Sequence, residues 1–395
     1  MTDDVVPGRP GDQPRRWPRA SEIARALDQR GRIERWLVIG LALVVGLGVV
    51  ARALELRTYW PAGVDLEIPL RAAARWAGGS QPYPASAMLV QSGPDLPFLY
   101  PPYLLPLLVP IAGLPRDAVI DFWLVGGLLV SIWACRRLGI PWPAVPFVLA
   151  WPPFLEGLTT GNVQVFAFAA FVALFYAPAD GAAVVRPRPR AFERARALPN
   201  GLLAAAIGAL KVTQLLPLAS LVRLQVRAVV VAVLALAALV IVTLPFTGAA
   251  AYGDWLAQLQ RAADPAWAPG GLTLGRSVGI PDAAVIAGGV AIALAARGRD
   301  LGAWLGIALL LATTSVHGYT FLFLLPGLLT IRRDLVIPIA ALFLGFYPGA
   351  WWLATGLVAA ALLCMPRWTW LRAAATVGVA GQQPSTEPGG TSLQM

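Results

Sequence analysis

The sequence contains few charged residues for its length. Only 13% of its 395 residues are Asp, Glu, Lys or Arg, and 57% are hydrophobic. Charged residues make up roughly 25% of an ordinary soluble domain, so a soluble globular enzyme is excluded. Because one bilayer-spanning helix needs about 20 predominantly apolar residues, the hydrophobic residues suffice for roughly eleven spans. We therefore predict an all-α polytopic integral membrane protein.

Cysteine and histidine are almost absent. The two cysteines, Cys135 and Cys364, lie far apart in the sequence without metal-ligand spacing, which argues against a disulfide framework or a zinc site. His317 is the only histidine, so a multi-histidine metal site is excluded. The sequence also has no P-loop, no HExxH and no GxGxxG motif that opens a helix after a strand. We expect no metal and no cofactor.

Lysine is equally scarce, because Lys211 is the only lysine among 31 basic residues. It stands in the apolar stretch AAAIGALKVTQLLP, where a charged side chain is unfavourable and marks a functional candidate. The net charge of +10 comes from arginines that cluster between apolar runs. The positive-inside rule explains this pattern, and we expect no nucleic-acid partner.

Long apolar runs define a membrane domain over 36–365. An Arg-, Ala-, Gly- and Pro-rich composition is typical of a GC-rich bacterial genome, so we expect a multi-pass protein of the bacterial plasma membrane. The polar segments 1–35 and 366–395 are predicted to be cytoplasmic tails, the second of them disordered. About twelve crossings are expected. The apolar segments are 36–54, 99–114, 118–135, 143–157, 163–177, 199–222, 228–246, 280–296, 301–316, 318–331, 334–346 and 348–365.

Two long polar connections, 57–98 and 247–279, contain few arginines and are expected outside the cytoplasm, whereas the basic cluster 186–196 is expected inside. An odd number of crossings must separate 57–98 from 186–196, yet four apolar segments lie between them. We interpret 143–157 as a re-entrant piece, because its prolines break helical hydrogen bonding. This choice leaves the arginines at the end of 118–135 outside, against the positive-inside rule.

Asp65 is the first candidate for chemistry. It precedes an amphipathic helix predicted over 66–77, in the extracytoplasmic connection just after the first span. One interpretation makes Asp65 only the N-cap of this helix. The other makes it a general base at the membrane surface, where it would take a proton from a sugar hydroxyl.

Two further residues carry alternative interpretations. Lys211 is either a structural residue that extends its ammonium group towards the interface or a cation that binds a lipid-linked phosphate. His317 is either a hydrogen-bonded structural residue or a member of the site. The remaining ionisable residues near apolar segments are Asp121, Glu156 and Glu67.

An ordered set of motifs resembles the GT-C superfamily of polyprenyl-phosphate-sugar glycosyltransferases, and most closely glycosyltransferase family 87, which contains actinobacterial-type α-mannosyltransferases. Asp65 precedes a G-x-x-P-Y element that ends at Tyr83, and Tyr100-Pro101-Pro102 opens the next span. A Gly-Asn-Val-Gln element covers 161–164, Lys211 precedes Pro217, and His317 opens a late span. The family more often has G-Q-x-N at the third element, so the two amides are exchanged here. The aromatic residue that usually follows the aspartate is missing.

The resemblance implies a GT-C-like bundle that transfers a sugar, expected to be mannose, from a polyprenyl-phosphate donor to a lipid or glycolipid acceptor. The transfer would invert the anomeric centre, and the partners would be these two substrates and membrane lipids. Asp65 and His317 are the implied catalytic residues, and Lys211 is the implied ligand of the donor phosphate. Further substrate contacts are implied for Tyr83, Tyr100, Asn162 and Gln164. The alternatives are a transporter or flippase of polyprenyl-linked sugars and a lipid-linked glycan polymerase or ligase.

Overall fold

The computed structural model divides the chain into two compact units, Met1–Gly48 and Val49–Met395. It describes residues 61–90, 93–176, 196–211, 215–264, 273–297, 300–331, 333–345 and 347–380, together with a few positions between 36 and 54. The predicted tail 1–35, the basic cluster 186–195 and most of the first span lie outside these residues.

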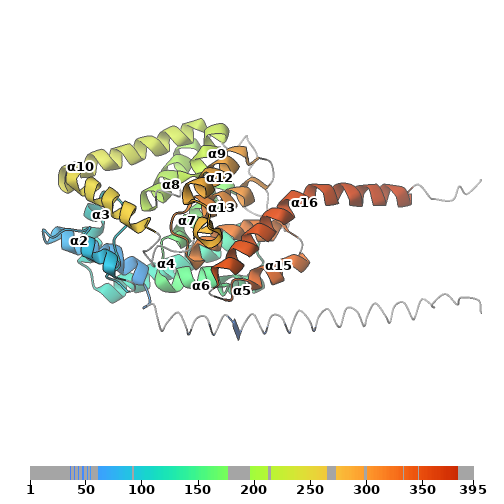
Figure 1. Ribbon diagram of the computed structural model, residues 1–395, viewed down its shortest axis with the longest axis horizontal. Helices are drawn as coiled ribbons and strands as arrows, with labels where there is room; N and C mark the ends of the chain where they lie inside the picture. Colours follow the sequence, from blue (N-terminus) through green and yellow to red (C-terminus); the bar gives the residue numbers. More distant parts are fainter. Residues whose placement is uncertain are drawn as a thin grey trace, which may run out of the picture. The chain divides into compact units, whose positions relative to one another are not determined.

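The described part of the second unit is built from helices, which confirms the predicted helical class (Figure 1). Among the described residues, two helices, α4 and α10, are long and apolar enough to cross a membrane, and several shorter apolar helices accompany them. The number of twelve crossings therefore stays a prediction. The elements are α2 (Val64–Ala77), η1 (Ala85–Leu89), α3 (Leu104–Ala112), α4 (Arg116–Arg137), η2 (Trp142–Ala144), α5 (Val145–Leu149), α6 (Pro152–Thr160), α7 (Gln164–Phe175), α8 (Ala197–Leu210), α9 (Pro217–Leu224), α10 (Val226–Ala262), α11 (Leu274–Val278), α12 (Asp282–Ala295), α13 (Leu301–Ala312), η8 (Gly318–Leu324), α14 (Leu325–Thr330), α15 (Arg333–Ala341) and α16 (Pro348–Ala380).

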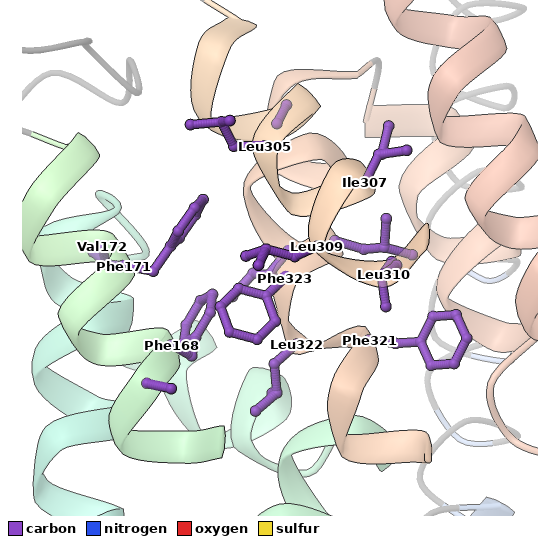
Figure 2. Close-up of a cluster of buried hydrophobic side chains, with 14 of the residues drawn as sticks. Phe168, Phe171, Val172, Leu305, Ile307, Leu309, Leu310, Phe321, Leu322 and Phe323 are labelled. Atoms are coloured by element: carbon purple, nitrogen blue, oxygen red, sulfur yellow. The ribbon is translucent and has the colours of Figure 1, made fainter. Parts of the chain in front are cut away.

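The core joins three apolar elements that are far apart in sequence. Figure 2 shows Phe168 and Phe171 of α7 facing side chains of α13 and η8. Phe323 of η8 makes edge-on contacts with both phenylalanines, at ring-centroid distances of 5.8 and 5.4 Å. These aromatic contacts stabilise η8, the element that follows His317.

The contacts of α4 show which elements lie at each of its ends. Arg116, at its first residue, forms an ion pair with Glu67 of α2. At its other end, the Arg137 side chain donates to the backbone oxygen of Tyr176, directly after α7, at 2.9 Å. The end of α6 returns to α2, because the backbone N–H of Gly63 donates to the oxygen of Thr159 at 2.9 Å. Thus α4, the α5–α6 pair and α7 each run between the same two ends.

This arrangement revises the choice of the segment that does not cross. Helix α3 has only 9 residues, which at 1.5 Å per residue span about 14 Å, roughly half of the hydrocarbon thickness. It lies along α2 through apolar side chains over its whole length. The contacts therefore favour 99–114, and not 143–157, as the segment that stays at one end. The arginines that close α4 then lie at the end opposite α2.

Helices α8 and α9 form the hairpin predicted for 199–222. Lys211 is the C-cap of α8, at the turn, and the Asn200 side chain donates to Gln225 at 2.9 Å, which joins the two other ends of the hairpin. Helix α10 runs along α8 and bends at Gly248, whose φ of 74° interrupts the helix (Figure 1).

The two connections 57–98 and 247–279 contact each other, as expected for loops on one face. The Gln81 side chain donates to Asp254 at 2.7 Å, and the Trp255 indole donates to the backbone oxygen of Leu99 at 3.0 Å. The second connection is more helical than expected, because α10 continues to Ala262 after its bend. At the C-terminus, α16 continues to Ala380, past the expected end of the membrane domain at 365, and residues 381–395 lie outside the described part.

Candidate active site

Asp65 is the second residue of α2 and not its N-cap. The helix begins at Val64, and its N-cap is Gly63, which has a φ of 74° and no side chain to cap with. The expectation that Asp65 caps the helix is therefore wrong, although a helix ending at Ala77 is confirmed. Because Asp65 is not needed as a cap, its half-buried carboxylate is available for contacts outside α2.

Two glycines let the start of α2 approach the end of α6. Gly63 and Gly161 both have positive φ angles, of 74° and 70°. A Cβ atom on Gly161 would lie 3.2 Å from the Gly63 Cα, and a Cβ on Gly63 would lie 2.6 Å from the Ile120 side chain. Side chains at these positions would force the backbones apart. The close approach brings Asp65 to Asn162.

Asn162 holds the Asp65 carboxylate in a defined orientation. Its Nδ2 donates to Asp65 Oδ2 at 2.9 Å, and its Oδ1 accepts from the backbone N–H of Gln164 at 2.9 Å. The bond to a backbone donor fixes which end of the amide is which. The amide group of buried Asn162 therefore faces the carboxylate with its hydrogens.

Ion pairs of Glu67 and Arg71 hold α2 in place. Glu67, 2% exposed, accepts from Arg71 one turn later at 2.8 Å and also pairs with Arg116 of α4. Arg71 in turn bonds Asp95 at 2.9 Å. A buried carboxylate with two guanidinium partners fixes the rotation of α2, and this rotation determines where Asp65 points.

The only lysine and the only histidine lie in the same cluster as Asp65. Lys211 is close enough to Asp65 for their charges to interact, and His317 in turn interacts electrostatically with Lys211. These three residues come from α2, from the end of α8 and from the connection before η8. The fold thus gathers residues that the sequence separates by more than a hundred positions.

The environment of Asp65 acts on its pKa in two directions. Burial raises the pKa of the carboxyl above its usual 3.8, whereas Thr160, Asn162 and the positive charge of Lys211 lower it. Burial is the larger effect. A carboxylate with a raised pKa is a stronger base than one in water, which suits proton abstraction.

His317 has partners within its own turn. Its ring Nε2 lies 3.1 Å from the Ser315 hydroxyl, its backbone N–H donates to the Thr320 hydroxyl at 3.2 Å, and its backbone oxygen accepts from the Thr320 N–H at 2.9 Å. Burial, with a smaller effect of Lys211, lowers the pKa of His317 to about 4. The imidazole is therefore neutral near pH 7, and a neutral ring offers one donor and one acceptor nitrogen.

Two tyrosines also interact with the Asp65 carboxylate. Tyr100, of the Tyr-Pro-Pro element, interacts electrostatically with Asp65. Tyr319, which the sequence interpretation did not single out, interacts with Asp65 and with the Asn162 side chain, and its ring stacks on His317 at 5.3 Å between centroids. The only sequence signal for Tyr319 is its position two residues after the histidine. Thr160 was also missed.

Two residues with predicted substrate contacts lie in the packed interior. Tyr83 is 2% exposed, donates to the backbone oxygen of Tyr100 at 2.8 Å and stacks on Phe98. Gln164 is fully buried and contributes its backbone N–H to Asn162. In this structure both support residues of the cluster from behind.

The cluster combines groups suited to moving one proton and stabilising one anion. A carboxylate can accept a proton, an ammonium group can stabilise a departing negative charge, and phenols and amides can hold hydroxyl groups. Among the described residues, no group of three or more His, Cys, Asp or Glu side chains is arranged to hold a metal ion.

Comparison with known families gives one match. Residues 98–316 match the family described as glycosyltransferase family 87, which is the family that the motifs resemble. The matched region contains Tyr100, Asn162 and Lys211, begins after Asp65 and ends directly before His317. Comparisons with curated proteins and with solved structures gave no match.

Proposed function

Because this chain belongs to glycosyltransferase family 87, a family of the GT-C type, we propose that it transfers mannose from a polyprenyl-phosphate donor. The acceptor is a lipid or glycolipid at the extracytoplasmic face of the bacterial plasma membrane. The observation that carries this proposal is the charge interaction between Asp65 and Lys211 beside the hydrogen bond from Asn162. It supplies a base and a cation at one place.

In the proposed reaction, Asp65 removes the proton from an acceptor hydroxyl as its oxygen attacks the anomeric carbon of the donor. The bond between this carbon and the phosphate oxygen breaks, and polyprenyl phosphate leaves with the electron pair. A single displacement of this kind inverts the anomeric centre. The raised pKa of Asp65 supports its assignment as the base.

Lys211 is proposed to bind the phosphate of the donor. Negative charge develops on this phosphate as the bond breaks, and a nearby ammonium group stabilises it most in the transition state. The charge of the lysine also favours the charged form of Asp65, against the larger effect of burial. His317, neutral and joined to the cluster through Lys211, is proposed to hydrogen-bond a substrate oxygen.

The test is a transfer assay with purified protein in detergent, radiolabelled polyprenyl-phosphate mannose and a lipid extract. We expect a labelled lipid product and a loss of about 100-fold or more in Asp65→Asn, which removes the base but keeps its size. Asp117→Asn is the matched control, because Asp117 is an exposed carboxylate in the first turn of α4.

Three outcomes contradict the proposal. Near-normal transfer by Asp65→Asn would show that Asp65 is not the base. Transfer from a different polyprenyl-linked sugar, with mannose inert, would remove the donor assignment. Movement of the intact donor across reconstituted vesicles, without any labelled product, would instead indicate a transporter or flippase.

A further inference from the structure

Tyr319 interacts with both acidic side chains of the site. It interacts electrostatically with Asp65 and with Glu156, and its phenol group interacts with the Asn162 side chain. Its position is closely fixed, because a Cβ atom on Gly157 of α6 would lie 3.2 Å from the Tyr319 Cβ. The ring is half-buried, so part of its surface remains accessible.

Glu156 reaches across from α6 to the turn that carries His317 and Tyr319. A Cβ atom on Gly318 would lie 2.0 Å from its Oε2 atom, so a glycine is required for the carboxylate to lie there. Glu156 is half-buried and lies one turn before Thr160, whose hydroxyl donates to the Glu156 backbone oxygen at 2.9 Å. This second carboxylate has no role in the proton transfer proposed for Asp65.

The side chain of Asn162 connects the two parts of this arrangement. One of its amide hydrogens is donated to Asp65, and the other is available to the Tyr319 oxygen. Two acceptors that share one NH₂ group lie roughly 5 Å apart when each bond has ordinary length. Neighbouring hydroxyl groups of one sugar can therefore reach Asp65 and Tyr319 together.

We propose that Tyr319 and Glu156 form a subsite that binds the hydroxyl group next to the attacking one, so that the acceptor is a carbohydrate and not a simple lipid alcohol. The neighbouring hydroxyl accepts a hydrogen bond from the Tyr319 phenol and donates its own hydrogen to Glu156. This inference rests on the proposed function, because it takes Asp65 as the base for the attacking hydroxyl.

The chemistry of the subsite fits an uncharged polyol. A hydroxyl group is both donor and acceptor, so a phenol and a carboxylate together satisfy it. A long-chain alcohol has no second hydroxyl and therefore makes neither of these two hydrogen bonds. A site that hydrogen-bonds a substrate hydroxyl discriminates against an analogue without that hydroxyl more strongly than shape alone does.

The test measures kcat/KM for octyl α-mannoside, for its monodeoxy analogues and for octadecanol. We expect octadecanol to be the poorest acceptor. One deoxy analogue that keeps the attacking hydroxyl should lose about tenfold with the wild type, as expected for one neutral hydrogen bond. Tyr319→Phe should lower kcat/KM for octyl mannoside by a similar factor. For the deoxy analogue, which lacks the hydroxyl that Tyr319 binds, the substitution should lower kcat/KM little further. Tyr347→Phe, which changes an exposed phenol, is the matched control.

If Tyr319→Phe does not fold, kcat/KM of Glu156→Gln is measured on the same acceptors. Equal losses of a variant on every acceptor would indicate a structural role and overturn the inference, as would use of octadecanol as efficiently as octyl mannoside. Failure of the proposed function is distinct, because the wild type would then transfer mannose to none of these acceptors. If transfer depends on Asp65, but the losses caused by Tyr319→Phe and by the missing hydroxyl are additive, only the subsite is rejected.

Discussion

Asn162 donates from Nδ2 to the Asp65 carboxylate while its Oδ1 accepts from the backbone N–H of Gln164. This relationship explains the exchanged amides of the 161–164 element. The side chain that contacts the carboxylate belongs to the second position of the element, whereas the fourth position is buried and uses its backbone. The amide that matters for the base is therefore the asparagine.

Replacing Asn162 by aspartate is expected to move the pH dependence of transfer. A second carboxylate beside Asp65 disfavours the charged form of both, so the pKa of the Asp65 carboxyl should rise further. We expect the acidic limb of the kcat/KM profile to move to higher pH by about 1 unit. An unchanged limb, with a uniformly lower rate, would mean that Asn162 acts only on folding.

The wild-type pH profile follows from the raised pKa of Asp65. A base must be deprotonated, so transfer should be lost as the pH falls through this raised pKa, which lies above the ordinary 3.8. Since the charge of Lys211 lowers the pKa of Asp65, Lys211→Gln should move the acidic limb to higher pH. A limb that moves to lower pH in this variant contradicts the effect assigned to the lysine charge.

Lys211 is expected to act on the donor more than on the acceptor. Lys211→Ala should raise the apparent KM for polyprenyl-phosphate mannose by about tenfold or more, because a charge-assisted contact to phosphate is lost. Lys211→Arg should retain measurable activity, since it keeps a cation. The measurement is a pair of saturation curves, one for each substrate. An unaltered donor KM in Lys211→Ala would favour the structural interpretation of this lysine.

Composition and apolar runs were sufficient to predict the helical membrane class, the amphipathic helix before Gly78 and the hairpin that carries Lys211. The exact start of α2 was not predictable from capping preferences. Aspartate is favoured at an N-cap, but the close approach of Gly63 to Gly161 makes the helix begin earlier. This tertiary contact outweighs the local preference.

The sequence predicts the site residues that carry a conspicuous charge. It does not predict those that are set apart only by their contacts in the folded protein. Asp65 and Lys211 are charged residues beside apolar segments, so the sequence alone marks them as functional candidates. Tyr319 is one of eight tyrosines, and nothing in its local sequence indicates that its phenol interacts electrostatically with Asp65. Glu156 was visible as an ionisable residue, but its place beside Gly318 depends on how α6 lies against η8.

The same limitation applies to the topology. The parity argument requires that one apolar segment does not cross the membrane, but it does not indicate which segment this is. Prolines drew attention to 143–157, whereas the decisive features are the short length of α3 and the contacts at both ends of α4. These contacts also remove the conflict with the positive-inside rule, since Arg137 then lies at the end opposite α2, which belongs to the connection expected outside.

Cysteine labelling in intact cells distinguishes the two topologies. On a background without Cys135 and Cys364, a membrane-impermeant reagent should label Ser80→Cys and Ala263→Cys, which are exposed positions in the two connections that contact each other. Pro143→Cys, in η2 beyond the end of α4, should react only after the cells are lysed.

Ala191→Cys is the control for the cytoplasmic side in this experiment, and retention of transfer activity verifies that each labelled variant is folded. A re-entrant 143–157 would leave the end of α4 outside, so labelling of Pro143→Cys in intact cells would restore that interpretation. Labelling of Ala191→Cys in intact cells would reverse the whole orientation. It would also move Asp65 to the cytoplasmic face, where the donor would have to be presented on the other leaflet.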